Sequence, residues 1–319
     1  GDWDRLLGEG MYGGNGMKEK LIMKRLILDI IKKYFPVVFV KYRYFKVFGK
    51  KLNLKNPTGF NEKILWLTLF WQDQRIVQCA DKYGLRQYVI GCLGSDNIMP
   101  RLYGVYEKVD DVRWEQFPKK FVIKCTHGCK YNILCENKEK LDINKAKNAL
   151  ATWMNTEYGP STYEPQYYAM KHRIISEEYI ETDSGLYPED YKLYCFNGKV
   201  KAILVCLNRE NVLNKNEELI LEWYDLKWKV LDIGAKPNKQ LAMKPTCLEK
   251  MVEYAEKLSK PFPFVRVDFY DRHEPILGEM TFTPMYGMAK YYSESGNKLL
   301  GSWLVLPDHK MKRKYKKED

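Results

Sequence analysis

Two neighbouring stretches of the sequence, FVRVDFY and GEMTFTP, constrain the fold more than any other part of the chain. In the first stretch Val265, Val267 and Phe269 alternate with Arg266 and Asp268. Because successive side chains of a strand point to opposite faces, this alternation predicts a strand with one apolar face and one charged face. The second stretch alternates in the same way, and the short DRHEP segment between them predicts a hairpin turn.

The predicted hairpin brings two carboxylates together. A turn centred near residue 273 or 274 places Asp268 almost directly opposite Glu279, with their Cβ atoms about 4.5–5.5 Å apart. Two carboxylates at this distance repel each other unless a cation joins them. Magnesium, which also takes phosphate oxygens as ligands, would do so. The pattern alone favours the alternative, in which Arg266 neutralises the pair or the sheet face is solvent-exposed.

A lysine in the stretch KKFVIKCTHGCKYN is a second candidate for nucleotide chemistry. Lys124 alternates with Ile123 and Cys125, so it points away from the core face of a predicted strand, and a loop containing Gly128 follows. A lysine on a strand beside a glycine-containing loop can hold nucleotide phosphates. The sequence contains neither a Walker motif nor G-x-G-x-x-G, so a solvated lysine on a half-exposed strand is the alternative.

A third group of charged residues lies in the next two predicted strands. The doublet Glu177–Glu178 follows an apolar run and could accept a hydrogen bond from a ribose hydroxyl. Further on, Asp190 and Lys192 alternate with apolar residues, and Lys192 could balance phosphate or substrate charge. A surface strand with alternating charge is the alternative. The mixed order of predicted helices and strands, with several antiparallel hairpins, predicts an α+β fold.

Positive charge is concentrated at the ends of the chain. The net charge is +12, of which residues 17–51 contribute +9 and residues 308–319 contribute +3. A nucleic-acid enzyme more often carries basic charge along its working cleft, so we expect no nucleic-acid partner. Apolar residues at helical spacing predict an amphipathic helix over 18–35, which Pro36 ends. This helix lies either on anionic lipid or on the body of the protein with a solvated basic face.

The cysteines indicate a reducing compartment. The chain has eight cysteines, several of them inside apolar stretches, and no secretory signal is visible, so we expect a cytoplasmic protein. Cys125, His127, Cys129 and Cys135 match no paired C-x2–4-C spacing, which disfavours a zinc site. No run of about 18 uncharged apolar residues could form a membrane-spanning helix.

The ordered set of motifs resembles the TupA-like ATP-grasp family of bacterial surface-polysaccharide biosynthesis. The stretches that carry the resemblance extend from about residue 52 to 307 and read LNLKNPTGFNEKILWL, ADKYGLRQYV, FVIKCTHG with Asn132, RIISEEYIE, DYKLYCFNGK, FPFVRVDFY and GEMTFTPMYG. The resemblance implies an ATP-grasp fold, in which two α+β subdomains hold ATP between them. The expected parts are an expression scar or disordered leader (1–16), a basic helical region (17–75), an N-terminal subdomain (76–175), a C-terminal subdomain (176–307) and a basic tail (308–319).

The resemblance also implies roles for individual residues. Lys124 would contact the phosphates of ATP, under a loop that includes His127, Gly128 and Asn132. The hinge that lines adenine and ribose would consist of Glu177, Glu178, Tyr179 and Ile180. Magnesium would be held by Asp268, Glu279 and Thr281. The residues expected near the phosphates or the acceptor are Lys192, Arg209 and Arg266.

Three features depart from the family pattern. The family loop reads H-G-S-G-G-N, whereas here Cys129, Lys130 and Tyr131 stand between Gly128 and Asn132. Two flexible glycines are thus replaced by bulkier residues, although Lys130 could supply charge. Asn208 stands where the family often has Asp, and Thr281 stands where many ATP-grasp enzymes have Asn as a stronger oxygen ligand.

The expected function is an ATP-dependent carboxylate–amine ligase that forms an amide through an acyl phosphate. Its substrates would be a sugar or amino acid, or a lipid-linked glycan, and its cofactors ATP and Mg²⁺. It would act in the cytoplasm, with a peripheral contact to the anionic inner face of the plasma membrane. One alternative is a phosphotransferase that uses the same site. The other is a binding protein for anionic lipid or nucleic acid with a decayed nucleotide site.

Overall fold

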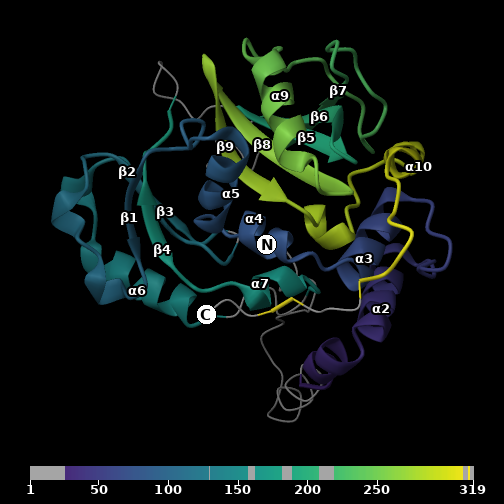
Figure 1. Ribbon diagram of the computed structural model, residues 1–319, viewed down its shortest axis with the longest axis horizontal. Helices are drawn as coiled ribbons and strands as arrows, with labels where there is room; N and C mark the ends of the chain where they lie inside the picture. The colour runs from purple at the N-terminus through teal and green to yellow at the C-terminus, as the bar shows by residue number, and fades with distance from the viewer. Residues whose placement is uncertain are drawn as a thin grey trace, which may run out of the picture. The chain divides into compact units, whose positions relative to one another are not determined.

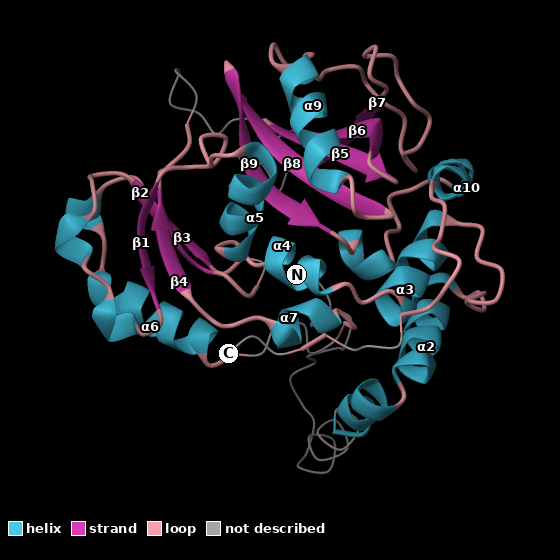
Figure 2. Cartoon of the chain, in the orientation of Figure 1, coloured by secondary structure: helices cyan, strands magenta, loops and turns pink. Residues whose placement is uncertain are grey.

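The computed structural model describes residues 26–128, 130–156, 162–181, 189–207, 219–311 and 315–316. The chain divides into two compact units, Gly1–Leu52 and Asn53–Asp319. Figures 1 and 2 show the helices and strands of both units. None of the helices within the described residues is long and apolar enough to cross a membrane.

The first unit contains a helix over residues 26–34, followed by α2 (Pro36–Phe48). Pro36 ends the first helix as predicted, because proline disfavours the helical conformation in the residue before it. The same proline occupies the first turn of α2, where its missing N–H leaves no helical hydrogen bond unmade. A second helix therefore begins where the sequence reading predicted only an end. It stops at Gly49, which has a left-handed φ of 66°.

The larger sheet of the second unit has five antiparallel strands in the order β7-β6-β5-β8-β9. Their bounds are β5 Asp190–Phe196, β6 Lys199–Leu207, β7 Ile220–Tyr224, β8 Phe264–Arg272 and β9 Glu274–Thr281. The predicted hairpin is present as β8 and β9, and it turns at His273, whose φ is 65°.

One face of this sheet is apolar and is covered by α9 (Leu248–Ser259), which crosses the sheet in Figure 1. Met251, Ala255 and Leu258 of α9 join Val265 and Val267 of β8 in one buried core. The alternation read from the sequence is therefore confirmed, since these residues share a face and Arg266 and Asp268 point away from it.

The smaller sheet has four antiparallel strands in the order β1-β4-β2-β3. Their bounds are β1 Leu102–Tyr106, β2 Phe121–Cys125, β3 Asn132–Cys135 and β4 Ile174–Glu177. One face packs on α6 (Ile143–Met154), which buries Ala146 and Leu150 against Phe121 and Ile123. Lys124 lies on the opposite face, as its alternation with Ile123 predicted.

The remaining helices of the second unit pack beside the two sheets. The α-helices are α3 Phe60–Phe70, α4 Gln74–Ala80, α5 Gly84–Leu93, α7 Pro165–Ala169 and α10 Glu294–Trp303. The 3-10 helices are η2 Val109–Asp111, η3 Trp114–Gln116, η4 Lys138–Lys140 and η5 Pro284–Gly287. Two antiparallel sheets with helices on their faces confirm the predicted α+β class.

Candidate functional site

The register of the β8–β9 hairpin brings together the two predicted carboxylates. Asp268 pairs directly with Glu279, as the sequence predicted. Nearer the turn, Phe269 pairs with Leu277, so the register shifts by one residue and Gly278 is the extra residue of a β-bulge. Without this bulge Asp268 would face Gly278 instead. The bulge therefore decides which side chain of β9 stands beside Asp268.

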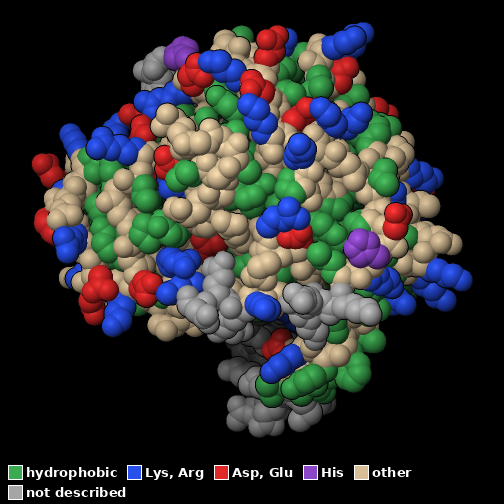
Figure 3. Space-filling model, viewed as in Figure 1, with side chains coloured by type: hydrophobic (Ala, Val, Ile, Leu, Met, Phe, Trp, Pro, Cys, Tyr) green, Lys and Arg blue, Asp and Glu red, His purple; other side chains and the backbone are tan. Residues whose placement is uncertain are grey.

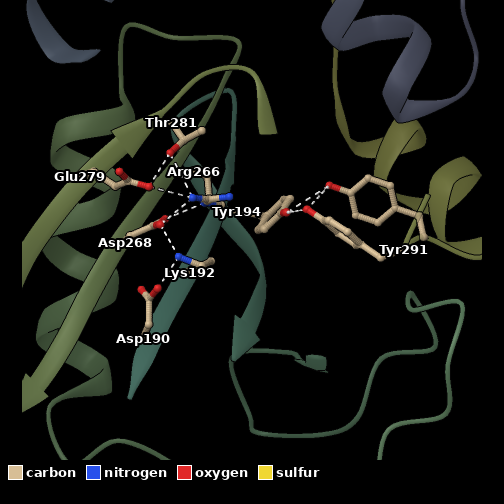
Figure 4. A network of polar contacts seen from close by, with 9 residues as sticks. Asp190, Lys192, Tyr194, Arg266, Asp268, Glu279, Thr281 and Tyr291 are labelled. Atoms are coloured by element: carbon tan, nitrogen blue, oxygen red, sulfur yellow. Dashed lines mark hydrogen bonds and ion pairs between the residues drawn. The ribbon is translucent and has the colours of Figure 1, made fainter. Parts of the chain in front are cut away.

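Two rows of polar side chains run across the polar face of the sheet, from β5 through β8 to β9. In the first row Lys192, Asp268 and Glu279 are direct cross-strand neighbours. In the second row Tyr194, Arg266 and Thr281 are direct neighbours. Figure 4 shows Lys192, Glu279 and Thr281 converging on Asp268 and Arg266. The ring of Tyr194 points the other way, and its hydroxyl contacts that of Tyr291. The structure thus brings five of the predicted site residues together.

Asp268 lies at the centre of this network. Arg266 donates from Nε to Asp268 Oδ1 at 2.7 Å and from Nη2 to Oδ2 at 2.6 Å. Lys192 Nζ donates to the same Oδ2 at 2.6 Å and to Asp190 Oδ2 at 2.5 Å. Burial alone would raise the pKa of Asp268, but the charges of Arg266 and Lys192 outweigh it and lower the pKa to about 2. Asp268 is therefore ionised at neutral pH.

Both cations are held in their charged form by the same contacts. Burial alone would lower the pKa of Lys192, but the carboxylates of Asp190 and Asp268 raise it above its ordinary value. Asp268 raises the pKa of the buried Arg266 in the same way. The sequence places Asp190 beside Lys192 in this strand, but it predicts a role, the balancing of negative charge, for Lys192 alone. The structure adds Asp190 as a direct partner of Lys192.

Glu279 is the accessible member of the cluster, with 49% of its side chain exposed. Its Oε1 accepts from Arg266 Nη2 at 3.0 Å and from Thr281 Oγ1 at 3.1 Å. Arg266 therefore lies between the two carboxylates, which is the neutralisation that the sequence pattern alone favoured.

The donor set also fits a hard cation. The exposed carboxylate of Glu279 lies beside the hydroxyl of Thr281 and close to the buried carboxylate of Asp268. These are the oxygen ligands that magnesium prefers. Among the described residues no group of three or more His, Cys, Asp or Glu forms a metal cluster by itself, so phosphate oxygens or water would have to complete the coordination.

Lys124 and Glu177 form a second polar group, on the face of the smaller sheet opposite α6. Lys124 Nζ is paired with Glu177 Oε1 in an ion pair that is largely buried. Asn132 pairs with Lys124 across β2 and β3, so the predicted phosphate-loop residue lies beside the predicted phosphate lysine. Strand β3 was not predicted from the sequence, because it has only four residues and most of them are exposed or partly exposed.

The predicted hinge follows the end of β4. Glu178 donates its backbone N–H to Arg101 O at 2.8 Å, and its Oε1 accepts from Arg272 Nη1 at 2.9 Å. Arg272 belongs to β8, so this ion pair joins the smaller sheet to the larger one. Tyr179 OH donates to Glu136 at 3.3 Å, and Ile180 is buried.

The loop after β2 is anchored by a histidine pair. His127 is buried and stacks on His172, with ring centroids 3.5 Å apart. Its Nε2 lies 3.0 Å from Trp153 O. Burial and the neighbouring His172 lower the pKa of His127 to about 4. Sequence reading missed His172, which is 45 positions away and comes close only through tertiary packing.

The departures from the family loop have a local consequence at Lys130. Its φ is 64°, a left-handed conformation that glycine adopts without strain and lysine does not. The backbone thus keeps a glycine-like conformation at a position where the family loop has glycine. On the other side of the loop, Lys82 Nζ donates to Gly128 O at 2.6 Å. Cys129, Asn208 and Arg209, which carried other predictions, lie outside the described residues.

A cavity of about 680 Å³ lies beside β1 and is lined by residues such as Asp111 and Arg113. It contains none of the predicted site residues and is separate from the polar rows of the larger sheet.

Two solved structures with a bound nucleotide are similar to this chain at low sequence identity. A D-alanine–D-alanine ligase from Bacillus anthracis complexed with ATP is 14% identical, with a TM-score of 0.44 over 77% of this chain. An N5-carboxyaminoimidazole synthetase from Staphylococcus aureus complexed with ADP is 13% identical, with a TM-score of 0.42 over 73% of this chain. The chain spans 64% and 54% of the lengths of these two structures. A comparison with curated proteins gave no match.

A family model decides the identity of the fold. The TupA-like ATPgrasp model matches residues 62–305, which is more than half of the chain and contains both sheets. The matched range includes every predicted site residue. The chain therefore belongs to the TupA-like ATP-grasp family.

Proposed function

We propose that the protein is an ATP-dependent carboxylate–amine ligase. The observation that carries this proposal is the row of Lys192, Asp268 and Glu279 on adjacent strands, in which Arg266 contacts both carboxylates. The chain that contains this row belongs to the ATP-grasp family. The row combines cations suited to phosphate oxygens with carboxylates suited to a divalent ion, and every one of these side chains comes from a rigid strand.

The proposed reaction has two steps. A carboxylate oxygen of the substrate attacks the γ-phosphorus of ATP, and the bond to the β,γ-bridging oxygen breaks, which gives ADP and an acyl phosphate. The amine of the second substrate then attacks the acyl carbon. The amide bond forms, inorganic phosphate leaves with the electron pair of the broken C–O bond, and the nitrogen loses a proton. Positioning and charge neutralisation carry both steps, so no nucleophilic side chain is required.

The residues of the chain divide this work between the two sheets. Lys124, next to Glu177, would hold phosphate oxygens from the smaller sheet, and Glu178 would meet the ribose after leaving Arg272. Magnesium would be held by Asp268, Glu279 and Thr281, and when bound it supplies positive charge to the phosphates. Arg266 holds both oxygens of Asp268 and so fixes the direction of that carboxylate. Lys192 balances the buried charge of Asp190 and Asp268.

The finer proposal concerns the product. We place the amide on a bacterial surface polysaccharide or its precursor, with a sugar or amino-acid substrate or a lipid-linked glycan, made in the cytoplasm. Family membership supports the use of ATP, and the polysaccharide assignment rests on the sequence resemblance alone.

Thermal unfolding with and without Mg-ATP tests the nucleotide site. Ligand at about one hundred times its dissociation constant should stabilise the folded chain by about 2.7 kcal/mol. We expect the shift in the wild type to be lost in Glu279→Gln, which removes the accessible carboxylate without exposing the buried network. Asp268→Asn should lose it too. Glu274→Gln is the matched control, because Glu274 lies on the same hairpin and pairs with Lys250. A magnesium-dependent shift that survives Glu279→Gln would contradict the site.

Trapping with hydroxylamine then separates ligation from phosphotransfer. A panel of sugar acids and amino acids is incubated with Mg-ATP, the protein and hydroxylamine. A ligase yields a hydroxamate and one ADP for each hydroxamate formed. A stable phosphorylated product that needs no amine would instead identify a phosphotransferase.

A further inference from the structure

Helix α2 carries two apolar faces, although a helix that packs on one neighbour needs only one. Phe39, Val40 and Tyr44 form its buried face. Val38, Tyr42 and Phe45 form a second stripe at i, i+4, i+7 spacing, with 56%, 36% and 52% of these residues exposed. Large side chains at this spacing lie on one side of a helix. Packing of the buried face therefore leaves the α2 stripe (Val38, Tyr42 and Phe45) unexplained.

The helix before α2 exposes apolar side chains in the same manner. Ile27, Ile30 and Tyr34 follow helical spacing and are at least half exposed, and Phe35, between the helices, is 60% exposed. In Figure 3 hydrophobic side chains gather over these two helices. Contiguous exposed apolar surface of this kind marks a site of interaction with a partner or a membrane.

Lysines border the α2 stripe on both sides. At about 100° per residue, Lys41 falls on one side of the stripe and Lys46 on the other, and both are exposed. Lys46 Nζ lies 5.9 Å from the ring centroid of Tyr42, and Lys33 Nζ lies 5.5 Å from that of Tyr34. Residues 26–52 hold seven Lys or Arg against one Asp, a net charge of +6. Lysine side chains thus lie on both sides of the α2 stripe.

We propose that the helix over residues 26–34 and α2 dock on the surface of an anionic lipid bilayer. Lysines beside an apolar stripe extend their ammonium groups to lipid phosphates while the stripe enters the acyl boundary. Tyrosine suits this depth, because its ring is apolar and its hydroxyl is polar. With 13 residues, α2 is about 20 Å long and lies in the interface instead of crossing it.

Charge argues for lipid over the other occupants. Self-association through a two-fold interface would bring together two copies of a segment whose net charge is +6, which is repulsive. Nucleic acid is bound by cations and stacking aromatics, and Tyr42 and Phe45 are aromatic. The aliphatic surface of Ile27, Ile30 and Val38 beside them has no counterpart in a nucleic acid, but it suits lipid acyl chains. An anionic membrane complements both the charge and the apolar stripe. The inference does not rest on the proposed function, because docking requires neither nucleotide nor turnover.

Co-sedimentation of the full chain with vesicles tests the proposal. The probes are vesicles of phosphatidylcholine alone and vesicles in which about one third is phosphatidylserine. We expect binding to the anionic vesicles only, weakened by salt. Val38→Ser/Tyr42→Ser/Phe45→Ser should weaken binding at least about tenfold, since it removes most of the α2 stripe. Lys41→Glu/Lys46→Glu should do the same.

Matched controls and a second variant keep the test decisive. Leu241→Ser/Met243→Ser removes exposed apolar residues elsewhere, and Lys227→Glu/Lys229→Glu reverses exposed charges elsewhere. Both should bind as the wild type does. Ile27→Ser/Ile30→Ser tests the preceding helix independently, should α2 fail to fold in the triple variant. Each variant should keep the Tm of the wild type in the absence of vesicles.

Several results would overturn the proposal. Wild-type chain that stays in solution, or binds neutral vesicles equally, excludes anionic lipid as the occupant. Stripe variants that bind like the wild type exclude these helices as the surface. A wild-type dimer without vesicles that the triple variant dissociates would assign the stripe to a second copy. Mg-ATP stabilisation is measured separately, so failure here leaves the nucleotide site untouched.

Discussion

Arg266 holds both carboxylate oxygens of Asp268, its neighbour two positions along the same strand. Both side chains are buried, and their backbone positions are fixed by hydrogen bonding of β8 to β5 and β9. A buried ion pair of this kind adds little to stability relative to apolar packing, but loss of one partner leaves a charge unpaired in the interior. We therefore expect Arg266 to be required for keeping the Asp268 carboxylate ionised and fixed in orientation.

Arg266→Met should lower the free energy of unfolding by about 3–5 kcal/mol at neutral pH, because Lys192 would then be the one cation among the described residues in contact with the buried Asp268 carboxylate. Chemical denaturation measures the change. Arg272→Met is the control, since Arg272 pairs with Glu178 in a partly exposed ion pair and should change stability by about 1 kcal/mol or less. Equal losses in the two variants would show that the Arg266–Asp268 pair is not buried as described.

Glu222→Gln should change how stability depends on pH. The buried Glu222 carboxylate accepts backbone N–H groups of Lys239, Leu241 and Ala242 and the hydroxyl of Tyr224. Burial alone would raise the pKa of Glu222, but these hydrogen bonds lower it. The stabilisation is therefore present above the unfolded pKa of about 4.3 and is lost as pH falls through the lower folded value.

Glutamine would present an NH₂ group to these donors, so we expect Glu222→Gln to cost about 1–3 kcal/mol at neutral pH. The variant should also show a smaller further loss of stability between about pH 5 and pH 3 than the wild type. Urea titrations across this pH range measure both effects. Glu249→Gln, at an exposed position of α9, should reproduce the wild-type profile. If the free energy of unfolding of Glu222→Gln depended on pH in the same way as that of the wild type, the ionised Glu222 would not be the source of this pH dependence.

The sequence predicted the parts of the site that depend on strand alternation. Apolar Val265 and Val267 alternate with charged Arg266 and Asp268 along the strand. A hairpin with a short turn leaves few possible registers, so the pairing of Asp268 with Glu279 could be predicted. The β-bulge at Gly278 that sets this register gives no periodic signal, and a neighbouring register fits the alternation almost as well.

Contacts across long sequence separations could not be predicted. The stacking of His127 on His172 and the ion pair of Glu178 with Arg272 exist because separate elements pack together. Helix α10 was missed for another reason. Gly296 and Gly301 lie inside it and lower its helix propensity, yet a Cβ on Gly296 would lie 2.1 Å from Ile233 O. Close packing of α10 thus requires the two glycines that weaken its helical signal in the sequence.

Gly301→Ala should therefore destabilise the protein, although alanine favours helices. A Cβ at position 301 would lie 2.2 Å from Thr58 O, so the backbone of α10 or the segment before α3 must move. Overpacking of this kind costs about 1–3 kcal/mol. Gly91→Ala, on α5, is the matched control, because its Cβ would meet nothing within 4 Å and should stabilise by about 0.5–1 kcal/mol. Thermal unfolding compares them, and changes of the same sign would refute the close approach.

His127 should stay neutral well below the pH at which an ordinary histidine is protonated. Burial and the stacked His172 lower its pKa from 6.5 to about 4. As pH falls from about 6.5 to about 4, the unfolded chain takes up this proton before the folded chain does, so the folded state loses stability across that window. The chain has four histidines, and two-dimensional NMR can follow their rings through a pH titration.

The resonance of His127 is assigned by its absence in His127→Gln. We expect its titration midpoint near pH 4, and a midpoint near 6.5 would show that the ring is not buried beside His172.

In the wild type, acidification from about pH 6.5 to about pH 4 should loosen the loop that contains Gly128, because a charged His127 would meet the ring of His172 at 3.5 Å. Hydrogen exchange of the backbone amides of Gly128 and Lys130 measures this. Their exchange should rise more steeply toward pH 4 than that of β8 amides, after correction for intrinsic rates, and His127→Gln should remove the difference.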